Sequence, residues 1–139
     1  MREYLYRGKR MDNGEWVYGD LLHTKTRLGK IVTEICTLEM KYRVYPETVG
    51  EFTGLTDTNG KKIFEGDIVS FVHDESFGRP YKITRNYEVQ FVNLFSRYGL
   101  RLKNKNIHFP FKQSTASMHD VEVIGNIHDN PELLEVCNG

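Results

Sequence analysis

The sequence has 139 residues, enough for one domain, residues 1–139, that buries a core without a disulfide or a metal. Its 19 basic and 19 acidic residues cancel, so the chain lacks the strongly basic character typical of DNA-binding domains. No apolar run approaches the ~20 residues of a membrane span and residues 1–10 do not form a signal peptide, which predicts a cytoplasmic protein.

The first predicted element is a β-hairpin. Its arms are residues 4–10 and 15–22, and the Asp-Asn-Gly sequence at residues 12–14 is typical of the tight turn between them. A polar loop is expected over residues 23–30. Residues 31–40 are compatible with a strand or with one short helix, and their β-branched side chains favour the strand.

A second hairpin is predicted within residues 46–69, PETVGEFTGLTDTNGKKIFEGDIV, where turn-forming residues separate short apolar runs. Asn59 and Gly60 are the favoured central pair of a two-residue type I′ turn, because both central positions of this turn require a positive φ. Residues 52–55 and 61–64 are then the two arms.

Another turn is predicted at Gly66 and Asp67, and an apolar strand follows from Ile68. Residues 81–91 and 98–102 alternate apolar and polar side chains with a period of two, which predicts two further strands. Turn chemistry explains four residues without any catalytic role, so we assign them a structural one: Asn59, Gly60, Gly66 and Asp67.

The C-terminal region predicts one strand and one helix. Residues 121–127 form the strand; Asn130 is suited to the N-cap of a short helix and Pro131 to its first position. Short strands separated by turns, without alternating helices, predict a mainly β (β-rich α+β) fold. The expected architecture is a small antiparallel SH3-like barrel or sandwich, with the N-terminal hairpin and the C-terminal helix added to it.

Three stretches of the chain resemble the YopX family: residues 46–69, residues 121–134 (VEVIGNIHDNPELL) and, more weakly, residues 6–22 (YRGKRMDNGEWVYGDLL). Residues 73–120 match only loosely. The resemblance implies a small protein encoded by phages and prophages of mainly Gram-positive bacteria, located in the cytoplasm of the bacterial host. It implies no activity and transfers no catalytic residue, because none is established for the family.

Charge is distributed unevenly along the chain. Residues 79–112 hold eight Lys or Arg and one acid, whereas residues 44–78 and residues 113–139 each have a net charge of −5. A basic segment with nearby aromatic residues has the side chains needed for phosphate contacts and base stacking. The candidate residues for binding nucleic acid or a protein partner are Arg79, Lys82, Arg97, Arg101, Lys103 and Lys105.

Three interpretations of this basic segment stay open. It is solvated or paired with acidic residues of the same chain, or it binds a second subunit or another protein, or it binds nucleic acid. The leading hypothesis is a non-enzymatic protein-interaction or assembly module, whose partner is another copy of the chain or a host or phage protein. The alternative is a nucleic-acid-binding protein that uses residues 79–112.

No pattern in the sequence points to catalysis. His119-Asp120 and His128-Asp129 flank the strand at 121–127, but nine residues of extended chain span roughly 30 Å, which keeps the two pairs from one metal ion. Cys36 and Cys137 have no CxxC partner and are expected to be free thiols. We therefore expect no enzymatic activity, no cofactor and no metal.

Overall fold

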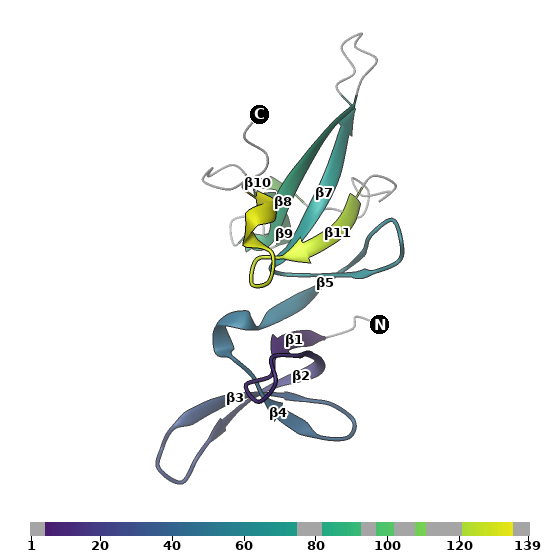
Figure 1. Ribbon diagram of the computed structural model, residues 1–139. Helices are drawn as coiled ribbons and strands as arrows, with labels where there is room; N and C mark the ends of the chain where they lie inside the picture. Colours follow the sequence, from purple (N-terminus) through teal and green to yellow (C-terminus); the bar gives the residue numbers. More distant parts are fainter. Residues whose placement is uncertain (1–4, 75–81, 93–96, 102–107, 111–120, 135–139) are drawn as a thin grey trace. The chain divides into compact units, whose positions relative to one another are not determined.

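The computed structural model describes residues 5–74, 82–92, 97–101, 108–110 and 121–134 (Figure 1). The chain forms two compact units, Met1–Gly54 and Leu55–Gly139, here named the N-terminal unit and the C-terminal unit. Each is described by itself, and a single domain over residues 1–139 stays a prediction. No helix in the described ranges has the length and apolar character needed to cross a bilayer.

The first sheet is antiparallel, with the strand order β4-β3-β2-β1-β5-β6. The opening hairpin is confirmed, and residues 31–36 form a strand, as their β-branched side chains predicted. The ladder between β2 and β3 continues to Lys25 and Ile31, so the loop is shorter than expected. The elements of the N-terminal unit are β1 (Tyr6–Lys9), β2 (Trp16–Lys25), β3 (Ile31–Cys36), β4 (Lys41–Arg43), the 3₁₀ turn η1 (Pro46–Thr48) and β5 (Gly50–Thr56), which continues into the C-terminal unit.

The sheet of the N-terminal unit bends so that the residues after β4 bond back to β1. Tyr45 donates its N–H to the carbonyl of Lys9 at 2.9 Å, and Arg10 and Val44 form a β-bridge. Val44 is 1% exposed and lies over Gly8, where an added Cβ would approach the Val44 Cβ to 2.9 Å. A side chain at position 8 would therefore push β1 away from the buried valine.

The second sheet belongs to the C-terminal unit and has the antiparallel order β10-β9-β8-β7-β11 (Figure 1). A buried cluster of five residues forms its core: Ile63, Val69, Tyr87, Val89 and Val121. The strands of this unit are β6 (Lys62–Phe64), β7 (Asp67–Asp74), β8 (Lys82–Val92), β9 (Arg97–Arg101), β10 (His108–Pro110) and β11 (Val121–Asn126).

The mainly β, antiparallel fold class is confirmed, but the SH3-like barrel is not. Over the described residues neither sheet closes, since one ends in the strands β4 and β6 and the other in β10 and β11. β6 belongs to the first sheet and β7 to the second, so the chain passes from one sheet to the other at the turn between them. A closed barrel would need all of these strands in one continuous ladder, whereas here they form two open sheets.

The C-terminal α-helix is also not confirmed. The residues form a 3₁₀ turn, η3 (Pro131–Leu134), in which Leu133 donates its N–H to the carbonyl of Asn130 at 3.1 Å. The Oδ1 of Asn130, predicted to cap a helix, instead accepts the N–H of Asn126 at 3.3 Å. Asn86 of β8 then donates to the carbonyl of Leu133 at 2.8 Å, which holds the short turn on the sheet.

The turn between β5 and β6 lies where it was predicted but has a different geometry. The N–H of Asp57 donates to the backbone carbonyl of Lys61, and the backbone carbonyl of Asp57 accepts the N–H of Gly60. The loop between Asp57 and Lys61 therefore has three residues instead of two. Gly60 has a φ of 80°, as a three-residue loop with a left-handed final position requires. The side chain of Asp57 accounts for the change, because its Oδ1 accepts the N–H groups of Asn59 and Lys61 at 2.9 and 2.8 Å.

The second predicted turn is confirmed. Gly66 has a φ of 92°, a conformation that glycine adopts without a steric penalty. Asp67 is 2% exposed, and its Oδ2 accepts the N–H of Phe64 at 2.8 Å across the turn. The carboxylate of Asp67 therefore has a structural role, because it accepts a backbone hydrogen bond that holds the turn.

Asp57 also connects its turn to the distant strand β11. Its Oδ2 accepts the N–H of Val123 at 2.9 Å, and Thr58 donates its N–H to the carbonyl of Val121 at the same distance. Asp57 is 5% exposed. One buried carboxylate therefore satisfies three backbone N–H groups and fixes the β5–β6 turn against the edge of the second sheet.

We expect replacement of Asp57 by alanine to lower the free energy of unfolding by about 3 kcal/mol or more, because three N–H groups lose a charged acceptor. Thr26→Ala is the matched control. The turn at residues 26–30 has the same backbone bonds, but the Thr26 Oγ1 accepts only the Lys30 N–H, at 3.1 Å, so its loss should cost about 1 kcal/mol. Urea unfolding followed by circular dichroism measures both, and equal losses would contradict the assigned role of Asp57.

Candidate functional site

The described residues place three of the six candidate basic residues on two paired strands of the C-terminal unit. Lys82 begins β8, and Arg97 and Arg101 are the first and last residues of β9. In the ladders, Lys82 is opposite Asp74 and Arg101 is opposite Glu88. Arg79, Lys103 and Lys105 lie outside the described residues, so the structure does not bring the six together as a site.

The His-Asp pair at 128 and 129 lies in the turn after β11. The N–H groups of His128 and Asp129 both donate to the Oδ1 of Asn126, each at 2.9 Å. The second pair, residues 119 and 120, lies outside the described residues, as does Cys137. Cys36 is a half-buried free thiol in β3.

The hollow that best fits a binding site lies in the N-terminal unit, at the end of the β2–β3 ladder. It has a volume of about 640 Å³ and is named the notch here. Three aromatic rings and two carboxylates dominate its lining, and no Lys or Arg contributes to it. The lining residues are Trp16, Val17, Tyr18, Gly19, Asp20, Cys36, Thr37, Leu38, Glu39 and Tyr42.

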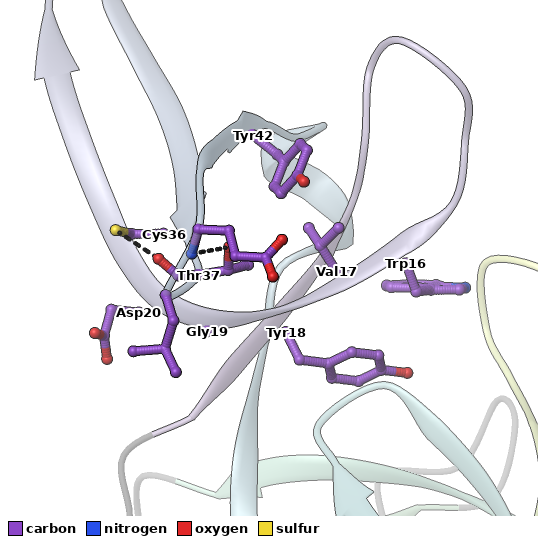
Figure 2. Close-up of a pocket in the computed structure, with 10 residues that line it drawn as sticks. Trp16, Val17, Tyr18, Gly19, Asp20, Cys36, Thr37 and Tyr42 are labelled. Carbon is purple, nitrogen blue, oxygen red and sulfur yellow. Dashed lines mark hydrogen bonds between the residues drawn. The ribbon is translucent and has the colours of Figure 1, made fainter.

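Strand alternation places side chains from both faces of β2 around the notch. Trp16 and Tyr18 project from one side of the β2 ribbon, whereas Val17 and Tyr42 lie on the other (Figure 2). The β2–β3 ladder ends at the pair Asp20 and Cys36, after which β3 turns away toward β4. The notch therefore lies where the sheet loses a neighbouring strand.

The turn that follows β3 forms one wall of the notch, and Thr37 holds it in shape. The Oγ1 of Thr37 accepts the N–H groups of Glu39 and Met40 at 3.2 and 3.0 Å and donates to the carbonyl of Met40 at 3.0 Å. The Thr37 N–H donates to the same carbonyl at 2.8 Å. These bonds fix the wall while leaving the carboxylate of Glu39 and the side chain of Leu38 exposed.

Gly19 permits the close approach of β2 to the end of β3. A Cβ at this position would overlap the carbonyl oxygen of Cys36 and lie 2.9 Å from its carbonyl carbon. These are backbone atoms, so a side chain at position 19 would force the two strands apart. Glycine is therefore required for packing here, and the shape of the notch depends on it.

Cations of the chain itself cover two of the aromatic rings. The guanidinium of Arg7, a 5% exposed residue, lies 4.7 Å from the ring centroid of Trp16, and the ammonium of Lys9 lies 5.7 Å from it. The guanidinium of Arg10 lies 4.3 Å from the centroid of Tyr42. Cation–π contacts of this kind hold the rings in place and reduce the entropy lost when a partner packs on them.

A second hollow of about 460 Å³ adjoins the notch and shares Tyr42 with it. It is named the basic hollow, because three cations and one carboxylate contribute to its lining, which consists of Arg10, Met11, Asp12, Met40, Lys41, Tyr42 and Arg43. The guanidinium of Arg10 donates two hydrogen bonds to the carboxylate of Asp12, at 2.6 and 2.9 Å.

The hydrogen bond from Arg10 lowers the pKa of Asp12 below its ordinary value of 3.8, and the same bond raises the pKa of Arg10. Both groups therefore stay charged at neutral pH. Because the pair lies at the surface, it orients the two side chains and adds little to stability.

The sequence predictions missed the notch. They placed Trp16 and Tyr18 in the opening hairpin and gave them no function, and Tyr42 received no assignment. One signal was present in the sequence. In a strand, Trp16, Tyr18 and Asp20 lie on one face, and Val17, Gly19 and Leu21 lie on the other. Two aromatic residues therefore share the face that carries an acid. Nothing local could indicate that the β3–β4 turn completes the site.

We expect Gly19→Ala to destabilise the N-terminal unit by about 3 kcal/mol, the upper range for an overpacked site, and to shift the fluorescence of Trp16, the one tryptophan of the chain. Gly29→Ala is the control, because its φ of 84° costs about 1 kcal/mol but the added Cβ would meet only the Lys25 Cε, at an ordinary contact distance of 3.8 Å. Urea unfolding and emission spectra of both variants test this. An unchanged emission spectrum in Gly19→Ala would contradict the packing role.

The comparisons with known proteins concern the fold and the family. The chain is similar to the crystal structure of protein EF1440 from Enterococcus faecalis, with a TM-score of 0.57 and 20% identity over 96% of this chain and 99% of that one. At this identity the likeness concerns the fold alone. No curated protein matches the sequence. The family described as YopX protein matches residues 5–135, nearly the whole length, and the chain therefore belongs to the YopX family.

Proposed function

We propose that the protein is a non-enzymatic protein-interaction module that binds its partner through the notch and the basic hollow. One observation carries the proposal. Among residues 5–70, 86–90 and 121–134, for which the structure describes side-chain exposure, eight large hydrophobic side chains are exposed: Met11, Tyr18, Leu22, Leu28, Ile31, Leu38, Met40 and Tyr45.

Single exposed hydrophobic residues are common on soluble proteins, whereas contiguous ones mark interaction sites. Four of these eight side chains gather at the two hollows. Tyr18 and Leu38 line the notch, Met11 and Met40 line the basic hollow, and the two hollows share Tyr42. The side chain of Leu38 is fully exposed, at 107% of its reference area. Water around these groups would be released when a partner covers them.

The residue types also suit protein binding. Trp, Tyr, Met and Arg are enriched in the cores of protein interfaces, and Trp, Tyr and Arg contribute most to their binding energy. Trp16 and Tyr42 are each held by a cation of the same chain, and the hydrogen bonds of Thr37 fix the adjoining wall. A preorganised aromatic surface of this kind loses little entropy on binding.

Replacing Leu38 by glutamate should abolish partner binding, because it places a charge in the apolar part of the notch. Leu28→Glu is a closely matched control, since Leu28 is 96% exposed but does not line either hollow. A displayed peptide library selected against the wild-type protein supplies the ligands. The enriched peptides should lose at least about tenfold in affinity for Leu38→Glu and keep it for Leu28→Glu. Equal binding to both variants would contradict the proposal.

Nucleic-acid binding by residues 79–112 stays a prediction. The ladder register supports the alternative of internal pairing, because Lys82 and Arg101 are each opposite an acidic residue and such cross-strand pairs are stabilising. We therefore expect titrations with single-stranded and double-stranded DNA to show at most non-specific affinity, with a Kd of about 100 µM or weaker at physiological salt. Tight, salt-sensitive binding that is lost when Arg101 and Lys103 are both changed to Glu would establish the alternative.

A further inference from the structure

We propose that the notch and the basic hollow together form a two-fold interface through which the chain pairs with a second copy of itself. The inference rests on the proposed function, since it names the partner that the interaction surface binds. It starts from one arrangement: two adjoining hollows of opposite charge lie on the same unit and share Tyr42.

The charges of the two linings are complementary. Asp20 and Glu39 line the notch without any basic residue, and both are exposed. Three cations line the basic hollow with one carboxylate, which already accepts two hydrogen bonds from Arg10. Lys41 and Arg43, the other two cations, are exposed.

Glu39 and Lys41 carry opposite charges on the two linings. Over the residues that the structure describes, neither Glu39 nor Lys41 forms a salt bridge. They lie two residues apart, at the end of the β3–β4 turn and the start of β4, and line different hollows. Each is therefore available to pair with an opposite charge on a partner that covers its hollow.

Adjoining hollows of opposite charge are self-complementary under a two-fold axis. A rotation that places the notch of one copy on the basic hollow of the partner necessarily places the partner's notch on the basic hollow of the first copy. With the axis close to Tyr42, both contacts form at once. A ligand of one charge sign would match only one hollow, which favours a second copy over such a ligand.

The apolar groups fit the same arrangement. Tyr18 and Leu38 in the notch are 47% and 107% exposed, and Met11 and Met40 in the basic hollow are 51% and 58% exposed. In the pair, all four side chains would leave water at the centre of the interface, with the charges around them. An apolar centre with a polar rim is the usual composition of a protein interface.

Charge reversal tests the proposal. Sedimentation equilibrium of the wild-type protein should show a reversible monomer–dimer equilibrium. Glu39→Lys and Lys41→Glu should each weaken it by about tenfold or more, because each substitution acts twice in a symmetric dimer. The variant with both substitutions should recover dimerisation, since the exchanged charges still oppose each other across the axis. Lys30→Glu, an exposed reversal in the β2–β3 turn, should leave the equilibrium unchanged.

A mixture of the two single variants gives an independent check. Each should be mainly monomeric alone, and mixing should restore pairing, because opposite charges then meet at both symmetric contacts. All substituted residues are exposed, so circular dichroism should show unchanged folding. Trp16 lines the notch, and its emission should therefore change as the wild-type protein is diluted.

The outcomes separate this inference from the proposed function. A protein that stays monomeric at every concentration overturns the two-fold pairing, but leaves the proposed function standing if selected peptides still distinguish Leu38→Glu from Leu28→Glu. A dimer that is insensitive to both Glu39→Lys and Lys41→Glu also overturns the pairing. Growth beyond dimers with rising concentration would mean an open, head-to-tail contact and overturns it as well.

Discussion

The arrangement of the N-terminal unit depends on the absence of a side chain at two positions of neighbouring strands. Val44 lies over Gly8 of β1, and the carbonyl group of Cys36 lies against Gly19 of β2. Neither contact has room for a Cβ. They allow the short sheet to bend until the residues beyond β4 bond back to β1, and this bend brings Tyr42 to the border between the two hollows.

Acidic residues have different roles in the two units. In the C-terminal unit, Asp57 and Asp67 are buried, and backbone N–H groups donate to their carboxylates, so these acids serve the fold. In the N-terminal unit, Asp20 and Glu39 are exposed on the wall of a hollow rich in aromatic residues. Burial and partner atoms, more than residue identity, separate structural carboxylates from those available to a ligand.

Local features of the fold could be predicted from the sequence, whereas features that need distant residues could not. Alternation and turn residues located the opening hairpin, the β5–β6 hairpin and the turn at Gly66, all formed within a few residues. The geometry of the turn at Asp57 was predicted wrongly, because the Oδ1 of Asp57 accepts the N–H groups of Asn59 and Lys61 and so shapes a three-residue loop. The helix prediction failed because the side chain of Asn130 is committed to Asn126.

The candidate site was harder to predict, because it joins residues from β2 and from the β3–β4 turn whose spacing forms no motif. Charge counting pointed instead to residues 79–112, the most basic part of the chain. There the register places Lys82 and Arg101 opposite acids, a relation between strands that composition alone does not contain. Trp16 and Tyr18 were visible as a pair on the acidic face of a strand, and this was the one usable signal.

The bond between Asp57 and Val123 also has a consequence for synthesis on the ribosome. Its two residues are 66 positions apart, whereas the ladders of β1, β2, β3 and β4 join residues near one another in sequence. Because a chain emerges from its N-terminus and units fold as they become complete, the N-terminal unit can assemble while the C-terminal unit is still unfinished. The surface that carries the two hollows can then form before the second sheet, which stays incomplete until β11 has been synthesised.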